Sequence, residues 1–312
     1  MDSPALPVLS LADPAGAFAE AIGRSFRQFG FALVRDHGLD RKLVARAWDL
    51  TRAFFALPDA EKRRYHVPGI AGARGYTPFG TEIAKGATRH DLKEFWHVGR
   101  DLPAGHPLES VMPANIWPLS REGFEQTLGA LFSEMDRVGG LLLSRIALHL
   151  KLAEDWFRPA TKDGNSILRL LHYPPVEDDA QGAIRAEAHE DINLITLLLG
   201  AEESGLQLLD RNGAWIDVAP PEGTLVVNIG DMLQRLTNHV LPSTTHRVRN
   251  PSGSAAGRSR YAMPFFLHLR SDFLIRTLPQ CIGSGNPDRY PEPIAADAYL
   301  QQRLREIGLA KP

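Results

Sequence analysis

The amino-acid sequence predicts a mostly β protein with flanking α-helices, in which the strands form a sandwich or jelly roll. Two observations support this fold class. Up to about residue 160, apolar residues recur mainly with helical spacing, whereas after Asn165 the chain changes to short apolar runs separated by turn residues. A series of short strands with regular turns is typical of sandwiches and jelly rolls.

The helical stretches have recognisable ends. From Pro14 to Phe29 the apolar residues follow an amphipathic pattern, which Gly30 breaks. Asp40 is suited to cap a second helix, because its side chain can accept a hydrogen bond from a free N–H of the first turn. In total we expect helices over residues 14–29, from Asp40 to before Pro58, from a Ser120 cap to about Leu152, and over residues 297–307.

The strands of the second half are predicted from apolar runs bounded by turns. Asn212-Gly213 lies between two such runs, which is a strong signal for a hairpin. We expect strands over residues 31–34, 167–173, 195–199, 206–209, 214–218, 224–229, 246–249 and 261–269. Residues 66–118 are rich in glycine and proline, so we expect loops and short strands there.

No linker or internal repeat divides the sequence, so we expect one structural unit. Within it we expect a mainly helical N-terminal region over residues 1–160, a jelly-roll core over 161–275 that carries the functional site, and a C-terminal tail with a helix over 276–312. The stretch from 120 to 152 carries an apolar stripe without a partner of its own. It should therefore pack on the outside of the sheet.

Composition excludes several classes of partner. The formal net charge is −2 at pH 7 and no block of lysine or arginine stands out, so nucleic acid is not an expected partner. No apolar run approaches the ~20 residues of a membrane-spanning helix, and the N-terminus lacks the pattern of a signal peptide. A single cysteine, Cys281, excludes an internal disulfide and fits a reducing compartment. We therefore expect a cytoplasmic protein without a membrane partner.

The apolar run from Ala188 to Gly200 is expected to form a buried strand with His189 and Asp191 at its leading edge. If these residues are extended, the two side chains point to the same side. Two ligands do not complete a metal site, and the best third candidate is His246, at the start of a later predicted strand. Two histidines and one carboxylate on one face of a metal, with open positions opposite, suit non-haem Fe(II) oxygen chemistry.

Arg260 is a candidate anion-binding residue. It stands at the head of an aromatic strand in the same β-rich half. Burying a guanidinium there costs free energy unless it meets an anion, and its planar fork suits a carboxylate. The sequence thus combines a metal triad with a carboxylate-binding group.

Several short motifs resemble those of one enzyme family. In the N-terminal region they are Gly30-Phe31-Ala32-Leu33-Val34-Arg35-Asp36-His37-Gly38, Phe54-Phe55-Ala56-Leu57-Pro58, Glu61-Lys62, Gly75-Tyr76 and Lys93-Glu94-Phe95. In the second half they are Tyr173-Pro174-Pro175, His189-Glu190-Asp191, Gly205-Leu206-Gln207, Val227-Asn228-Ile229-Gly230-Asp231, Thr244-Thr245-His246-Arg247-Val248 and the Arg260 strand. From about Phe29 to Leu269 the chain resembles the isopenicillin N synthase-like family of Fe(II)- and 2-oxoglutarate-dependent oxygenases.

The resemblance implies a double-stranded β-helix core in which His189, Asp191 and His246 hold iron. It also implies that Arg260 pairs with the far carboxylate of 2-oxoglutarate, with Tyr173 nearby. The expected activity is oxidative decarboxylation of 2-oxoglutarate, coupled to hydroxylation or another oxidation of a small-molecule substrate by molecular oxygen.

Two departures from the family pattern concern the co-substrate. Ala262 stands where the family usually has the serine of Arg-x-Ser, and Leu171 where it usually has the asparagine of Asn-x-Tyr. A hydrogen bond to a charged group is worth ~1.5–3 kcal/mol, so its loss would weaken 2-oxoglutarate binding. One alternative is therefore an Fe(II) oxidase of the same family that uses no 2-oxoglutarate. Another is a non-catalytic ligand-binding β-helix protein, which the complete triad disfavours.

The remaining histidines and aromatic residues are less informative. His172, beside Tyr173, could face either side of its strand, and we assign it no role at this point. Trp96, Phe266 and His268 are candidates for lining a substrate pocket, although aromatic strand residues belong to a core more often.

Overall fold

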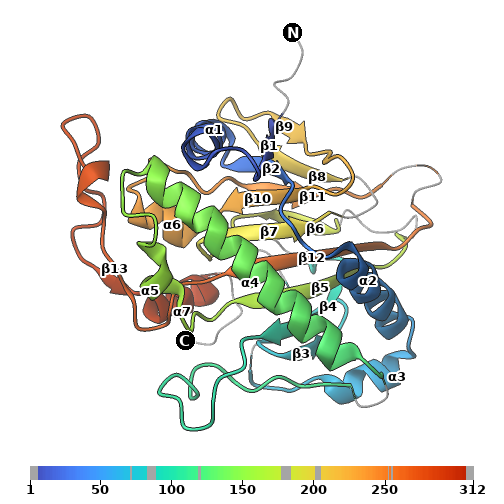
Figure 1. Ribbon diagram of the computed structural model, residues 1–312. Helices are drawn as coiled ribbons and strands as arrows, with labels where there is room; N and C mark the ends of the chain where they lie inside the picture. The colour runs from blue at the N-terminus through green and yellow to red at the C-terminus, as the bar shows by residue number, and fades with distance from the viewer. Residues whose placement is uncertain are drawn as a thin grey trace.

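The computed structural model describes residues 6–70, 72–82, 89–118, 121–176, 184–200, 205–251, 253 and 256–306. A large sheet and a small sheet face each other, and helices cover the outer face of the large one (Figure 1). The large sheet consists, in spatial order, of β1 (Val8–Ser10), β2 (Phe31–Arg35), β10 (Leu225–Ile229), β7 (Ile195–Leu199), β12 (Arg260–Leu267), β5 (Ile167–Tyr173), β4 (Glu94–Gly99) and β3 (Gly75–Thr77).

The small sheet consists of β6 (Ala186–His189), β11 (His246–Val248), β8 (Leu206–Leu209) and β9 (Trp215–Asp217), in that order. A short separate ribbon pairs β13 (Leu274–Ile275) with β14 (Ile294–Ala295). Neighbouring strands in both main sheets are antiparallel except β1 and β2. This is the predicted jelly roll, with strands from residues 1–160 at both edges of the large sheet.

Strand alternation gives the large sheet two apolar faces. In β10, for example, Leu225 and Val227 belong to the core beneath the helices, whereas Val226 belongs to a second cluster shared with the small sheet. We call the side turned toward the small sheet the inner face. Side chains two residues apart on one strand therefore share either the inner face or the helix-covered face.

The described part of the chain contains the four helices that the sequence predicts and three short helices that were not predicted. The predicted helices are α1 (Ala15–Phe29), α2 (Arg41–Phe55), α4 (Phe124–His149) and α7 (Ala296–Glu306). The others are α3 (Asp59–Lys62), α5 (Phe157–Thr161) and α6 (Asp231–Leu236), with 3₁₀ turns η1 (Arg63–Tyr65) and η3 (Pro279–Cys281). Asp40 Oδ1 accepts a hydrogen bond from Lys42 N at 2.8 Å, so the predicted cap of α2 is confirmed. The predicted Ser120 cap lies outside the described residues, and α4 begins at Phe124, after Gly123.

Gly30 shows why α1 ends at that point. Its φ of +67° is a left-handed conformation, and its N–H donates to Phe26 O at 2.8 Å. A Cβ atom here would lie 2.1 Å from Thr244 Oγ1, so only glycine fits. The tight turn leads α1 directly into β2, next to the segment that precedes His246.

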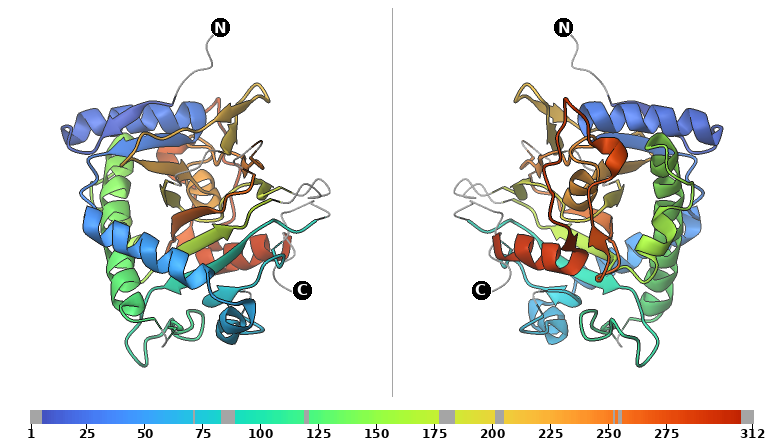
Figure 2. Two further views of the ribbon diagram at one scale, coloured as in Figure 1. Left: turned by 90° about the vertical axis from the view of Figure 1, so that its right-hand side faces the viewer. Right: turned by 90° about the vertical axis from the view of Figure 1, so that its left-hand side faces the viewer.

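Helix α4 covers the large sheet, with α1 packed near one end and α2 near the other (Figure 2). Its buried stripe includes Leu128, Met135 and Leu142, as the apolar periodicity predicts. Gly139 lets the helix approach β12 closely, because a Cβ there would lie 2.3 Å from Leu267 Cδ1. Among the described residues, no helix combines the length and apolar character needed to cross a membrane.

Candidate metal centre

The three residues predicted as metal ligands come together at the ends of two paired strands. His189 is the last residue of β6 and His246 is the first residue of β11, and they stand opposite each other in the ladder. Asp191 follows two positions after His189. One ligand atom from each of these residues lies within 4.8 Å of the other two; Asp191 and His246 are buried and His189 is half-buried.

The local structure of this segment differs from the sequence prediction. His189 and Asp191 were expected at the leading edge of one strand that runs to Gly200, and this prediction is wrong. β6 ends at His189 in the small sheet, and β7 begins only at Ile195 in the large sheet. Asp191 lies in the crossing between the two sheets, so the pair converges through a change of sheet rather than through strand alternation.

Both histidines are oriented by main-chain carbonyl groups. Nδ1 of His189 lies 2.6 Å from Glu187 O, and Nδ1 of His246 lies 3.1 Å from Thr244 O. A carbonyl oxygen only accepts hydrogen bonds, so Nδ1 must carry the proton in each ring. This tautomer leaves the lone pair of each Nε2 available for a metal, as is usual for metal-binding histidines.

The two carboxylate oxygens of Asp191 have different surroundings. Its Oδ2 accepts hydrogen bonds from Thr196 Oγ1 at 2.5 Å and from Asn228 Nδ2 at 2.8 Å. Its Oδ1 instead faces His246 Nε2 at 3.9 Å. Two hydrogen bonds thus fix one oxygen, and the other is directed at the point where the histidine nitrogens meet.

The electrostatic environment favours the protonation states that bind a metal. Burial, with the nearby His246, lowers the pKa of His189 to about 4, so its ring is neutral. Burial by itself raises the pKa of Asp191, but the two histidines and the bonds from Thr196 and Asn228 outweigh it and hold the pKa below its usual value. A neutral His189 and an ionised Asp191 are the states in which these side chains bind Fe(II).

Arg260 and Tyr173 form a second pair nearby. Arg260 begins β12, Tyr173 ends β5, and the two residues are directly opposite in the ladder. The Arg260 guanidinium carbon lies 5.2 Å from the centre of the Tyr173 ring, and each residue is only 3% exposed. Ala262 and Leu171, the two departures from the family pattern, form the next inward-facing pair along the same strands.

The three candidate pocket residues lie in different places. Trp96 is fully buried on the helix-covered face, where its ring packs on Phe54 at 4.8 Å between centroids, so it belongs to the core. Phe266 is opposite Thr196 in the ladder, close to the metal ligands. Burial of His268 lowers its pKa to about 4, and the Asp191 charge opposes this shift.

Sequence reasoning missed the residues that support the ligands. Thr196 and Asn228 are polar residues within otherwise apolar strands, and that contrast was the available signal. A second group involves α7: Arg303 Nη2 lies 2.9 Å from Asp231 Oδ2 and 3.9 Å from Glu190 Oε2. Glu190 also accepts a hydrogen bond from Thr245 Oγ1 at 2.7 Å.

A jelly roll that brings two histidines and one carboxylate to one point is typical of non-haem Fe(II) oxygenases, and this is the class to which the fold and the site point. Comparisons with known proteins agree. Residues 6–120 match the non-haem dioxygenase in morphine synthesis N-terminal family, and residues 164–269 match the 2OG-Fe(II) oxygenase superfamily.

Individual relatives match nearly the whole chain. The 2-oxoglutarate-Fe(II) type oxidoreductase hxnY of Emericella nidulans is 34% identical over 296 residues, which are 90% of this chain and 84% of that protein. A solved 2OG-Fe(II) oxygenase family protein from Caulobacter crescentus is 53% identical with a TM-score of 0.91, over 98% of this chain and 100% of that chain. A full-length Neurospora crassa protein, solved in complex with alpha-KG (2-oxoglutarate) and thymine, is 28% identical with a TM-score of 0.85, over 96% of both chains.

The chain therefore belongs to the 2OG-Fe(II) oxygenase superfamily, with the N-terminal region of the isopenicillin N synthase-like enzymes. It is a 2-oxoglutarate-dependent dioxygenase whose cofactor is Fe(II), and it acts on a small-molecule substrate with molecular oxygen. The predicted double-stranded β-helix fold is confirmed by the same comparisons.

Proposed function

We propose that His189, Asp191 and His246 hold one Fe(II) ion, and that Arg260, packed on Tyr173, binds the far carboxylate of 2-oxoglutarate. The enzyme would then couple decarboxylation of 2-oxoglutarate to hydroxylation or another oxidation of its substrate. One observation carries the proposal: three donor atoms lie within 4.8 Å of one another, while the remaining polar atom of each ligand already has a hydrogen-bond partner.

Fe(II), when bound, supplies the activation of oxygen that converts 2-oxoglutarate to succinate and carbon dioxide while the substrate is oxidised. The contribution of the protein is to position the reactants and exclude water. The planar fork of Arg260 orients a carboxylate, and the ring of Tyr173 holds the fork in place. Ala262 and Leu171 add an apolar wall, which strengthens the attraction between the guanidinium and its anion by lowering the local dielectric constant.

Family membership favours this function over the two alternatives, an oxidase without 2-oxoglutarate and a non-catalytic ligand-binding protein. The Neurospora crassa structure with thymine supports a compact small-molecule substrate for this chain as well. The inner-face residue Phe266, beside Thr196, is suited to contact such a substrate near the metal.

An anaerobic titration tests the metal and the co-substrate together. Fe(II) is added to the metal-free protein under argon, and 2-oxoglutarate is then added while the visible absorption spectrum is recorded. We expect a metal-to-ligand charge-transfer band that saturates with one 2-oxoglutarate per chain. If Fe(II) binds but neither the band nor retention of 2-oxoglutarate on dialysis is observed, the oxidase alternative replaces this proposal.

A further inference from the structure

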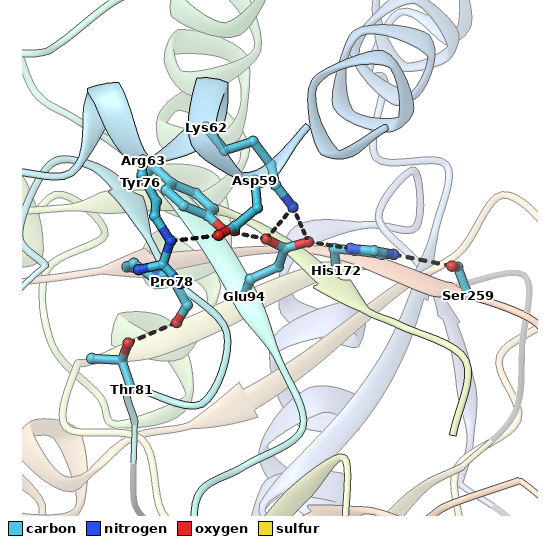
Figure 3. Close-up of polar contacts among 9 residues, drawn as sticks. All are labelled: Asp59, Lys62, Arg63, Tyr76, Pro78, Thr81, Glu94, His172 and Ser259. Carbon is cyan, nitrogen blue, oxygen red and sulfur yellow. Dashed lines mark hydrogen bonds and ion pairs between the residues drawn. The ribbon is translucent and has the colours of Figure 1, made fainter. Parts of the chain in front are cut away.

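A buried polar cluster lies on the helix-covered face, on the side of β5 opposite to that of Tyr173. Figure 3 shows its side chains. Its centre is Glu94, the first residue of β4, which is 3% exposed. The carboxylate oxygens of Glu94 lie 2.9 and 2.7 Å from Lys62 Nζ, and Oε2 also accepts a hydrogen bond from the Tyr76 hydroxyl. We call Lys62, Tyr76, Glu94, His172 and Ser259 the Glu94 cluster.

His172 extends this cluster to the start of β12. Its Nδ1 lies 2.6 Å from Glu94 Oε1, and its Nε2 lies 3.0 Å from Ser259 Oγ. The ring is stacked on Tyr261, with 4.8 Å between centroids and a 15° interplanar angle, and it also contacts Phe55 at 5.3 Å. The ring therefore has a fixed position and uses both nitrogens.

The two residues joined by this bond adjoin the proposed co-substrate residues. His172 precedes Tyr173 on β5, and Ser259 precedes Arg260 on β12. Arg260 and Tyr173 are the last pair of the ladder, and Ser259 would next face Pro174, which has no N–H to donate. The regular ladder thus stops at the point where two functional side chains must be held, and one more main-chain bond joins the two segments beyond it, from Val176 N–H to Ala256 O at 3.0 Å.

A side-chain bond, between His172 and Ser259, lies at this end between the last ladder pair and the Val176–Ala256 main-chain bond. Because side chains alternate along a strand, His172 and Ser259 point away from the inner face that Tyr173 and Arg260 share. The His172–Ser259 bond therefore ties the two strand ends together without occupying the co-substrate site. Glu94 holds the other side of the His172 ring against β4.

We propose that His172 is a positioning residue for 2-oxoglutarate, which holds the ends of β5 and β12 so that Arg260 and Tyr173 keep the geometry that binds the co-substrate. This inference rests on the proposed function. It also explains how this protein can bind 2-oxoglutarate although Ala262, at the position of the family's serine, has no hydroxyl group. Because the Arg260 side chain is already held in place, it loses less conformational freedom when 2-oxoglutarate binds. This gain compensates for the hydrogen bond that a serine at position 262 would have donated.

Two single variants and their combination test the proposal. Ser259→Ala removes the hydroxyl with little change in packing, and His172→Phe keeps a ring between Phe55 and Tyr261 while removing both hydrogen bonds. Ser133→Ala is the matched control, because it removes an exposed hydroxyl that bonds Gly129 O at 3.0 Å on α4. For each protein, the dissociation constants of 2-oxoglutarate and of Fe(II) are measured under argon, together with the thermal unfolding midpoint.

We expect Ser259→Ala to weaken 2-oxoglutarate binding several-fold, the size of one lost hydrogen bond, and His172→Phe to weaken it about tenfold, because it also removes the bond to Glu94. Fe(II) affinity should stay within about twofold, because the hydrogen bonds of the cluster among the described residues involve none of the three metal ligands. The double variant should be no weaker than His172→Phe, since both changes remove the same bond. The Ser133→Ala control should bind both ligands as the wild type does.

A merely structural role gives a different result. In that case the variants lower the unfolding midpoint but bind 2-oxoglutarate as tightly as the wild type, and the inference is overturned. If His172→Phe does not fold, Ser259→Ala decides the outcome by the same criterion. If the wild type binds Fe(II) but no 2-oxoglutarate, the proposed function itself fails and the positioning role fails with it.

Discussion

At the scale of single residues, hydrogen bonds within the protein orient all three side chains of the candidate metal centre. The carbonyl groups of residues 187 and 244 set the two histidine tautomers, and Thr196 and Asn228 fix one oxygen of Asp191. Each of these contacts lowers the entropy that metal binding must remove. Metal affinity should therefore depend on the three ligands and also on the contacts that orient them.

The ligand assignment predicts a loss of iron. His189→Ala and His246→Ala should each bind much less than one Fe(II) per chain, because two ligands cannot hold the ion as three do. Metal content after reconstitution and desalting measures this. His239→Ala is a suitable control, since His239 is exposed and bonds the Tyr290 hydroxyl at 2.6 Å. Stoichiometric iron in both ligand variants would refute the assignment.

The co-substrate assignment predicts opposite effects at two positions of β12. Arg260→Ala should abolish measurable 2-oxoglutarate binding and succinate formation, because removing one partner of a buried ion pair costs about 3–5 kcal/mol. Ala262→Ser should tighten binding modestly, by adding a hydroxyl on the same side of the strand. The measurement is the 2-oxoglutarate dissociation constant under argon with Fe(II). Unchanged binding by Arg260→Ala would show that another group holds the carboxylate.

At the scale of elements, the site is built from strand ends. β6 ends at His189, β11 begins at His246, β5 ends at Tyr173 and β12 begins at Arg260. Side chains at such ends can face a ligand, but the ladder holds them less firmly there than in the middle of a sheet. Contacts from neighbouring elements supply the missing support, from Glu94 of β4 at one place and from Arg303 of α7 at another.

Helix α7 is predicted to stabilise the segment between the metal ligands. Arg303 pairs with Asp231, whose main-chain N–H donates to Asp191 O at 2.8 Å. Arg303→Met should lower the free energy of unfolding by about 1–2 kcal/mol, since the guanidinium is only partly buried. It should also weaken Fe(II) binding, because Asp231, which holds the main chain of Asp191, would itself be held less firmly.

Arg305→Met is the matched control for this prediction, because Arg305 lies on the same helix but is exposed. Chemical denaturation and Fe(II) titration are run on both variants. Equal stability and equal metal affinity in the two variants would mean that Arg303 has no role at the centre.

At the scale of the whole molecule, the regions predicted from the sequence share one core. Phe132 of α4 packs on Phe265 of β12 with 5.1 Å between ring centroids, and Ile275 belongs to the same apolar cluster. β2 also pairs with β10, so a strand from the N-terminal region continues the large sheet. Separating these regions would expose apolar surface on both sides of the cut.

A fragment tests this interdependence. Residues 160–312 expressed alone should be insoluble or molten, because β10 would lose β2 and the sheet would lose α4. Solubility, near-ultraviolet circular dichroism and thermal unfolding are compared with those of the full chain. A soluble fragment with a cooperative unfolding transition would instead mean that two independent domains are present.

Local patterns in the sequence were enough to predict much of the fold. The end of α1 at Gly30, the cap of α2 at Asp40 and the bounds of β5, β7 and β8 agree with the structure. These features depend on residues within a few positions of one another, so periodicity and turn chemistry encode them directly. The residue types of the candidate triad and Arg260 were predictable for a related reason, since metal and carboxylate chemistry restricts the side chains that can serve.

Only the tertiary structure decided how these elements meet. The sequence alone could not place His189 and Ile195 in different sheets, because an apolar run does not reveal which strand it pairs with. The Glu94 cluster was equally hidden, since Glu94 and His172 are 78 residues apart, and His172 and Ser259 are 87 apart. Contacts over such separations arise from the order of strands in the sheet and from packing, and local sequence patterns encode neither of these. The sequence therefore determined which residues carry the chemistry, and the packing of the two sheets determined what holds them in place.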